Sequence, residues 1–178
     1  MIGLLRFVGL LNAAIWFGAS FYFAIAVAPT ASSQQLQTLL TANNYPFFGG
    51  AIAQIYLTRF LRLHLICGIV AFLHLTAEWI YLGRYPQRLR LGLLSILFFV
   101  GLLSAYWIQP SLRQWHVLKY GRTTSAADRE QAARSFRLWH TVSESINLFL
   151  LAGVGVYFWG VSNPPDAARF VSTAKFRS

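Results

Sequence analysis

Five ionisable side chains lie within two long apolar stretches of the sequence, 63–82 and 138–159. They are His64, His74, Glu78, His140 and Glu144. An ionisable group at the centre of an apolar layer costs about 2.5–3.5 kcal/mol on insertion scales, so such residues usually face a protein interior or a wet cavity. There they relay protons or bind ligands, or they hydrogen-bond neighbouring helices together.

Helical spacing places the polar residues of each stretch on one face. At about 100° per residue, the first stretch has a polar face about 80° wide, and the second has one about 100° wide. The first face consists of His64, Cys67, His74 and Glu78; the second consists of His140, Ser143, Glu144 and Asn147. If the two faces meet, they form a polar ladder of titratable groups through most of the apolar layer. The members of that ladder are His74, Glu78, Ser143, Glu144 and Asn147.

The same spacing also supports a purely structural interpretation. His74 and Glu78 are four residues apart, as are His140 and Glu144, so each pair can interact along its own helix and serve packing only. The fourth histidine, His116, lies outside the apolar stretches, where we expect a solvated or interfacial side chain.

The composition excludes most classes of soluble protein. Of the 178 residues, 56% are hydrophobic and 11% are charged, and the mean hydropathy is +0.50. Soluble domains have about 25% charged residues, so a soluble enzyme, a disordered tail and a collagen-like fibre are excluded. The net charge is +10, but most basic residues flank apolar runs, which favours an anionic lipid surface over nucleic acid. The single cysteine, Cys67, cannot form an intrachain disulfide.

Four apolar runs are long enough, or nearly so, to cross a bilayer as helices. The predicted spans are approximately 7–28, 61–82, 91–108 and 137–159, followed by a basic tail at 160–178. The sequence therefore predicts an all-α fold, an integral membrane four-helix bundle in one domain comprising residues 1–178. The first run also resembles a cleaved signal peptide, with an A-x-A pattern at 26–28, but it is longer than the usual signal core, which favours a retained helix.

The connections between the spans have helical signals of their own. Leu36, Leu39 and Leu40 predict a short interfacial helix in the first loop, ended by the stretch 43–46, and the next helix should begin near Ala51. After the third span the chain continues without a breaker to residue 121. Ser125-Ala126-Ala127-Asp128 then matches a capping box. We therefore expect an extended helical hairpin between the third and fourth spans.

Two histidines suggest a cofactor. His64 and His140 lie near the start of spans that run in the same direction, so we expect them at similar depth. They could ligate a haem or a chlorophyll-type tetrapyrrole between the second and fourth spans, with Cys67 and Ser143 lining the pocket. An absorption band lost in His64→Ala or His140→Ala would identify such a group. No metal site is predicted, because carboxylate-bridged bundles use Glu-x-x-His, whereas this chain has His-x-x-x-Glu.

Short motifs resemble a known family. Phe136-x-x-x-His140-x-x-Ser143-x-x-x-Asn147-Leu148 resembles the last helix of the bacterial family DUF4149, whose eukaryotic relatives are called transmembrane protein 205. Trp16-x-Gly18-x-x-Phe21, in a run that ends at Pro29, resembles the first helix of that family, and 51–63 resembles the approach to its second helix more loosely. The resemblance covers most of residues 7–160. It implies four spans, no assigned reaction and no catalytic residues. The topology is also similar to four-span, haem-associated CopD-type proteins.

The absence of known catalytic motifs indicates the class of function that the sequence predicts. No phosphate-binding loop, nucleophile elbow or dinucleotide fingerprint is present, so the sequence does not predict an enzyme. It predicts a membrane accessory or interaction subunit, whose partners are the lipid bilayer and other membrane subunits rather than nucleic acid. Proton or small-solute conduction along the His/Glu ladder and tetrapyrrole binding are the alternatives. Basic residues number seven on the side with both termini and eight on the other; the seven lie in shorter segments, which favours cytoplasmic termini.

Overall fold

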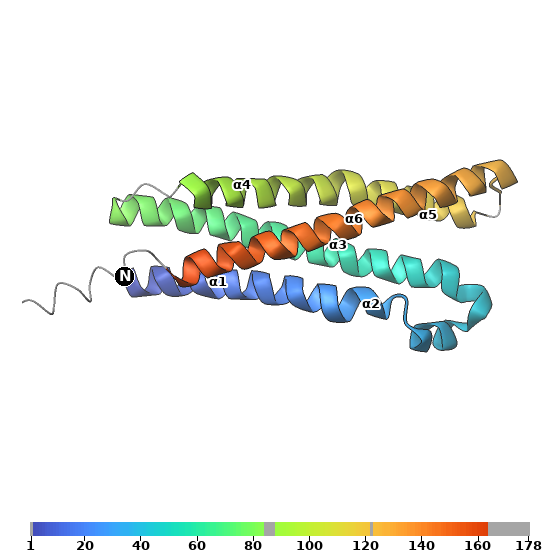
Figure 1. Ribbon diagram of the computed structural model, residues 1–178, viewed down its shortest axis with the longest axis horizontal. Coiled ribbons are helices and arrows are strands. Elements are labelled where there is room, and N and C mark those ends of the chain that lie inside the picture. Colours follow the sequence, from blue (N-terminus) through green and yellow to red (C-terminus); the bar gives the residue numbers. More distant parts are fainter. Residues whose placement is uncertain (1, 84–87, 122, 164–178) are drawn as a thin grey trace, which may run out of the picture.

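The computed structural model describes residues 2–83, 88–121 and 123–163, and this part of the chain is almost entirely helical (Figure 1). The elements are α1 (Ile2–Tyr22), a π-helical segment η1 (Phe23–Val27), α2 (Ala28–Thr30), α3 (Gln34–Leu82), α4 (Arg88–Leu103), a second π-helical segment η2 (Ser104–Ile108), α5 (Gln109–Tyr120) and α6 (Ala126–Ser162). The predicted all-α bundle is confirmed. Most of the predicted basic tail lies outside the described residues.

Four of these helical stretches are long and apolar enough to cross a membrane. They are Gly3–Thr30, Asn43–Tyr81, Arg88–Tyr120 and Ala126–Ser162. Many large apolar side chains remain exposed on their outer faces, among them Leu73, Phe99 and Leu148, which is consistent with contact with a lipid bilayer. The 37 residues of α6 correspond to about 55 Å at 1.5 Å per residue. The helices are thus longer than the roughly 30 Å hydrocarbon layer.

The four spans form a closed ring, in which consecutive spans pack together and the last span packs against the first. α1 packs on α3, α3 on α4, α4 on α6 and α6 on α1. α3 and α6 are therefore diagonal neighbours, as the topology of alternating helices predicts. In Figure 1, α6 crosses the bundle obliquely, so that its first half lies along α5 and its second half along α1.

The first connection contains the expected short helix. Ser33 caps its start, with its hydroxyl oxygen accepting a hydrogen bond from the Leu36 amide. The helix breaks at Thr41, whose φ of 63° and ψ of 154° are not helical. The long helix then begins again at about Asn43, so the expectation of a start near Ala51 is wrong. Pro46 is tolerated there because the first turn of a helix lacks carbonyl partners for its amides.

The hairpin between α5 and α6 is also confirmed. The Ser125 hydroxyl accepts a hydrogen bond from the Asp128 amide at 3.2 Å and donates one to the Asp128 carboxylate at 2.6 Å. α5 packs along the first half of α6. Both helices continue beyond the apolar stretches, at the end of the bundle where the short helix of the first connection also lies (Figure 1).

Two π-helical segments interrupt the first and third spans in the same way. In each, the amide after the segment bonds five residues back: Ala28 to the Phe23 carbonyl, and Gln109 to the Ser104 carbonyl. A proline follows at once, Pro29 or Pro110, and proline has no amide to continue the α-helical pattern. The next residue is Thr30 or Ser111. Its hydroxyl donates to the carbonyl four residues earlier, at 2.6 Å for Thr30 and 2.8 Å for Ser111.

Three histidine rings pack directly against glycines of neighbouring helices. A Cβ added at Gly9 would meet the His74 ring at 2.3 Å, one at Gly101 would meet His64 at 2.6 Å, and one at Gly50 would meet His116 at 2.4 Å. Only glycine permits these rings to lie so close to a neighbouring helix. Around them, apolar side chains fill the interior, including Leu94, Leu97, Leu150 and Val154.

This packing predicts unequal effects of two glycine substitutions on α4. Gly101→Ala should lower the free energy of unfolding by about 1–3 kcal/mol, because the added methyl group overpacks the core against His64. Gly92→Ala is the control, since a Cβ there meets nothing within 4 Å; it should be neutral or slightly stabilising. Denaturant titration of the detergent-solubilised protein, followed by circular dichroism, measures both. Equal losses would contradict the packing described.

Candidate ligand-binding cavity

His64 is completely buried, and both of its ring nitrogens are engaged. The Trp16 Nε1–H donates to His64 Nδ1 at 2.9 Å. Because an indole nitrogen can only donate, Nδ1 must be the acceptor, and the proton of the neutral ring resides on Nε2. Nε2–H donates to the Leu97 carbonyl at 3.2 Å. His64 thus joins α1, α3 and α4 and has no nitrogen free for an axial ligand bond in this arrangement.

His74 and His116 form similar contacts between helices. The Nε2 of His74 donates to the Leu5 carbonyl on α1, and the Nε2 of His116 donates to the Phe47 carbonyl on α3, each at 3.0 Å. His116 is only 3% exposed, so the expectation of a solvated or interfacial histidine is wrong. α5 packs directly on α3, and the early start of the long helix of α3 places Phe47 beside it.

The structure does not bring His64 and His140 together. Leu97 accepts the hydrogen bond from His64, and its side chain also lies 2.5 Å from the position of a Cβ on Gly153 of α6. The α6 residue level with His64 is therefore close to Gly153. His140 lies more than three helical turns earlier, about 20 Å along α6. The expectation of similar depth is wrong, and one tetrapyrrole iron cannot have both histidines as axial ligands in this arrangement.

At the end of the bundle that contains the N-terminus, Glu78 belongs to an ionic cluster. Arg90 Nη1 donates to Glu78 Oε2 at 3.0 Å, and His74 Nε2 lies 3.8 Å from Glu78 Oε1. The Arg90 guanidinium also lies over the Tyr157 ring at 5.7 Å from its centre. This cluster joins α3, α4 and α6. The carboxylate of Glu78 is paired with Arg90, whereas Arg90 Nε and His74 Nδ1 are buried without a hydrogen-bond partner among the described residues.

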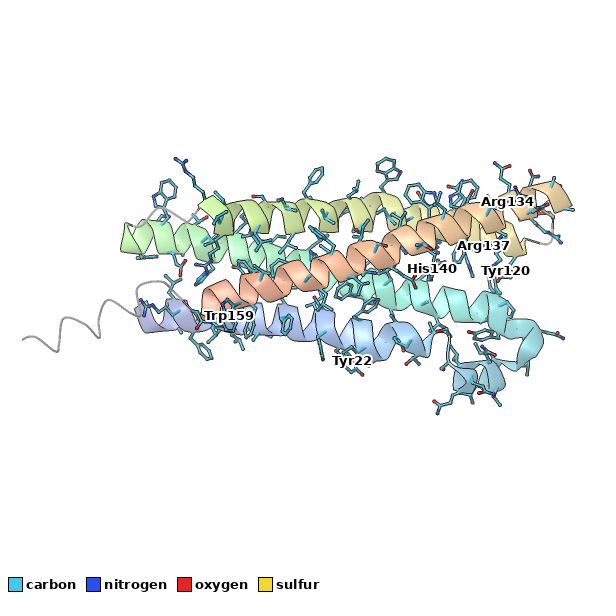
Figure 2. All side chains as sticks on the ribbon, in the orientation of Figure 1. Tyr22, Tyr120, Arg134, Arg137, His140 and Trp159 are labelled. Carbon is cyan, nitrogen blue, oxygen red and sulfur yellow. The ribbon has the colours of Figure 1, made fainter. Side chains whose placement is uncertain are left out.

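At the opposite end of the apolar stretches, α1 and α6 diverge around a cavity of about 360 Å³. Its walls are formed by η1 and the residues that follow it, by the first half of α3, by Leu112 of α5 and by the first half of α6. Most of the lining is apolar or aromatic, and includes Phe23, Leu57 and Phe136. Figure 2 shows His140 in this part of α6, with Arg134 and Arg137 nearer to the hairpin and Trp159 at the other end of the helix.

The whole polar face of α6 lines this cavity. His140, Ser143, Glu144 and Asn147 all contribute to the wall. His140 Nδ1 lies 3.4 Å from Glu144 Oε1, and 51% and 65% of the two side chains are exposed. Within the described part of the chain, no hydrogen bond from another side chain engages Ser143 or Asn147. The cavity therefore presents polar groups that are available to a ligand.

Gln54 of α3 adds a buried donor that the sequence did not single out. Its side-chain nitrogen is inaccessible to solvent and has no hydrogen-bond partner among the described residues, and Gln54 lines the same cavity. A buried amide donor without a partner costs about 1–3 kcal/mol. His74 Nδ1, Arg90 Nε and His116 Nδ1 are also buried without a hydrogen-bond partner among the described residues. The only sequence signal is a glutamine within the apolar stretch 51–57.

The predicted polar ladder is interrupted between its two ends. The ionic cluster at Glu78 and the cavity at Glu144 are separated by a packed core that includes Trp16, Leu97 and Leu150. Ser143, Glu144 and Asn147 belong to the cavity, whereas His74 and Glu78 belong to the cluster. In the described residues no group of three His, Cys, Asp or Glu side chains could hold a metal ion.

Comparisons with known proteins do not identify a function, so the functional proposal depends on the geometry described above. No family model, no curated protein and no solved structure matches the chain.

The hydrogen bonds of His64 lead to a prediction about Trp16. Trp16→Phe keeps an aromatic ring but leaves His64 Nδ1 buried without a donor, which should cost about 1–3 kcal/mol of stability. Trp159→Phe is the control, because Trp159 is 71% exposed. Denaturant titration gives the loss, and ¹⁵N NMR of labelled histidine should show the Nε2–H tautomer of His64 in the unaltered protein. A protonated Nδ1 would refute the assignment.

Proposed function

We propose that this protein is an integral membrane accessory protein that binds one small amphiphilic molecule in the cavity between η1, α3 and α6. The observation behind this proposal is the combination of an apolar enclosure with polar groups that lack protein partners. Ser143 and Asn147 supply hydrogen-bonding groups, and Glu144 supplies a carboxylate. Binding sites for small molecules commonly combine mostly apolar walls with a few placed polar groups.

The position of the cavity favours an amphiphile over a water-soluble solute. Its α6 wall lies at the start of the apolar stretch 138–159, close to where α5 and α6 extend beyond the apolar layer. A molecule there can place its polar end against α6 and its apolar part against side chains such as Phe23 and Val27. Trp107 and Trp139, whose ring centres are 6.4 Å apart, lie at a similar level, and tryptophan pairs are typical of the membrane–water interface.

The family resemblance agrees with this site. Of the five residues of its α6 motif, four line the cavity, namely Phe136, His140, Ser143 and Asn147, whereas Leu148 is exposed on the outer face. The resemblance implies no reaction, which supports an accessory role in a larger membrane assembly rather than an enzyme. The packed core that interrupts the His/Glu ladder favours binding over conduction.

Native mass spectrometry of the protein purified in a mild glycoside detergent tests the proposal. We expect one amphiphile to be retained per protein. The double variant Ser143→Ala/Asn147→Leu should weaken binding by about tenfold, which corresponds to the loss of one or two hydrogen bonds. Ser145→Ala is the matched control, because this neighbouring serine is exposed and donates to its own helix, at the Thr141 carbonyl. Retention of no amphiphile, or equal binding by all three proteins, would reject the proposal.

Flux measurements separate binding from conduction. Liposomes with the purified protein should acidify no faster than protein-free liposomes under an imposed pH gradient, because the core between the cavity and Glu78 is packed. Proton flux that disappears in Glu144→Gln combined with His74→Phe would establish conduction along the ladder instead.

A further inference from the structure

Two arginines lie on the outer face of α3, far from either end of that helix. Arg59 and Arg62 are three residues apart, so they lie on one side of the helix, and both are exposed. Within the described residues, no hydrogen bond or ion pair engages either of them. Beyond Arg62 the outer face of α3 is apolar, with Ile66, Ile69 and Leu73 exposed. The two arginines therefore interrupt a largely apolar surface.

Contacts with neighbouring helices place this arginine pair within the depth of the first predicted span. The Phe23 ring stacks on the Phe60 ring with their centres 4.4 Å apart, and the Gln109 amide donates to the Thr58 hydroxyl at 2.8 Å. Five more residues of the uncharged run 7–28 follow Phe23, which correspond to about 8 Å of helix. If hydrocarbon covered that whole run, both arginines would lie well inside it, where an exposed charge is costly.

The fourth predicted span, 137–159, shows the same mismatch. Thr141, Glu144 and Ser145 lie inside this span and are exposed on α6. Glu144 lines the same cavity as Phe23, so this part of α6 lies near the level of the arginine pair. Exposed polar and charged side chains favour the headgroup layer over the hydrocarbon. The hydrocarbon therefore ends before the apolar runs of the first and fourth spans do.

A boundary at the arginine pair gives the hydrocarbon layer its usual thickness. Arg59 precedes Glu78 by 19 residues on α3, which correspond to about 28 Å of helix. The hydrocarbon of a typical bilayer is about 30 Å thick. At the far end of this interval, Glu78 pairs with Arg90, and Trp79 is exposed. Charged groups and exposed aromatic side chains are typical of the membrane–water interface.

Exposed aromatic side chains also occur at the level of the arginine pair. Tyr22 precedes Phe23, and Tyr106 and Trp107 lie shortly before Gln109; all three are exposed. They come from α1 and η2, on both sides of α3 in the ring of helices. Three elements of the bundle thus have interfacial residues at one level.

We propose that Arg59 and Arg62 bind the phosphate groups of membrane lipids and thereby set the position of the protein in the bilayer. The planar guanidinium presents paired N–H donors that match phosphate oxygens. The hydrocarbon layer then extends from this pair to the Glu78–Arg90 ion pair. The chain from η1 to residue 58, together with α5 and the first half of α6, lies outside the hydrocarbon. This inference does not depend on the ligand of the cavity, so it can fail while the proposed function stands.

Native mass spectrometry of the delipidated protein in a glycoside detergent tests the phosphate contact. Phosphatidylglycerol should bind Arg59→Gln/Arg62→Gln about tenfold more weakly than the unaltered protein. Arg134→Gln/Arg137→Gln is the matched control, because these arginines are also exposed and three residues apart but lie nearer to the hairpin (Figure 2); it should bind like the unaltered protein. Digalactosyldiacylglycerol, which has no phosphate, should bind all three proteins equally. Equal binding of phosphatidylglycerol by the two double variants would overturn the phosphate contact.

Cysteine labelling in lipid nanodiscs locates the boundary itself, because both faces of a nanodisc are open to a membrane-impermeant maleimide. Ser145→Cys should be labelled, since it lies at or beyond the level of the arginines, whereas Ile69→Cys should be protected by lipid tails. Both positions are exposed on the surface of the protein. The unaltered protein, whose only cysteine is the buried Cys67, gives the background. Comparable labelling of the two positions would overturn the boundary.

An acidic membrane protein is the competing partner for the arginine pair. If a second membrane polypeptide co-purifies with the unaltered protein and is lost only in Arg59→Gln/Arg62→Gln, the arginines contact that protein and the lipid assignment fails. If Ser145→Cys is labelled and Ile69→Cys is protected while phosphatidylglycerol binds the two double variants equally, the boundary stands and the phosphate contact fails.

Discussion

The packing of histidine rings on glycines determines how the four helices fit together. His64 lies against Gly101, donates to the Leu97 carbonyl and accepts from Trp16, so that three helices meet at one buried side chain. In a lipid bilayer the hydrophobic effect does not drive helices together, because lipid tails are as apolar as the side chains. Side-chain hydrogen bonds between helices therefore contribute much of the packing specificity. The axial positions of the helices follow from such contacts.

The two ends of the bundle use ionisable residues differently. At one end, Glu78 is matched by Arg90, and the cluster joins helices that would otherwise be held by apolar contacts alone. At the other end, Glu144 lines a cavity, with 65% of its side chain exposed, and pairs with His140 of its own helix. The cavity and the polar face of α6 that lines it are the basis for placing a binding site at this end.

The cavity lies where α6, which crosses the bundle obliquely, diverges from the end of the first span (Figure 1). η1 and Pro29 interrupt the regular helix, and the chain after them turns into the short helix of the first connection. Isolated π-helical turns within α-helices often occur at functional sites. Here Phe23 and Val27 of η1 line the wall opposite α6. The irregular segment thus forms part of the cavity wall.

The sequence by itself determined the number of helices, their approximate bounds, the capped hairpin and the polar face of α6. These features depend on local patterns: apolar length, a capping serine and a repeat of 3.6 residues. Only the tertiary structure decided how far each helix slides along its neighbours. Because the helical pattern repeats every turn, a shift of several turns leaves the same residues facing inward. For this reason His64 and His140 both lie on the polar faces of their helices but at different depths along the bundle. For the same reason the burial of His116 could not be predicted from the sequence. Gln54 became a site residue only when α3 and α6 enclosed the same cavity.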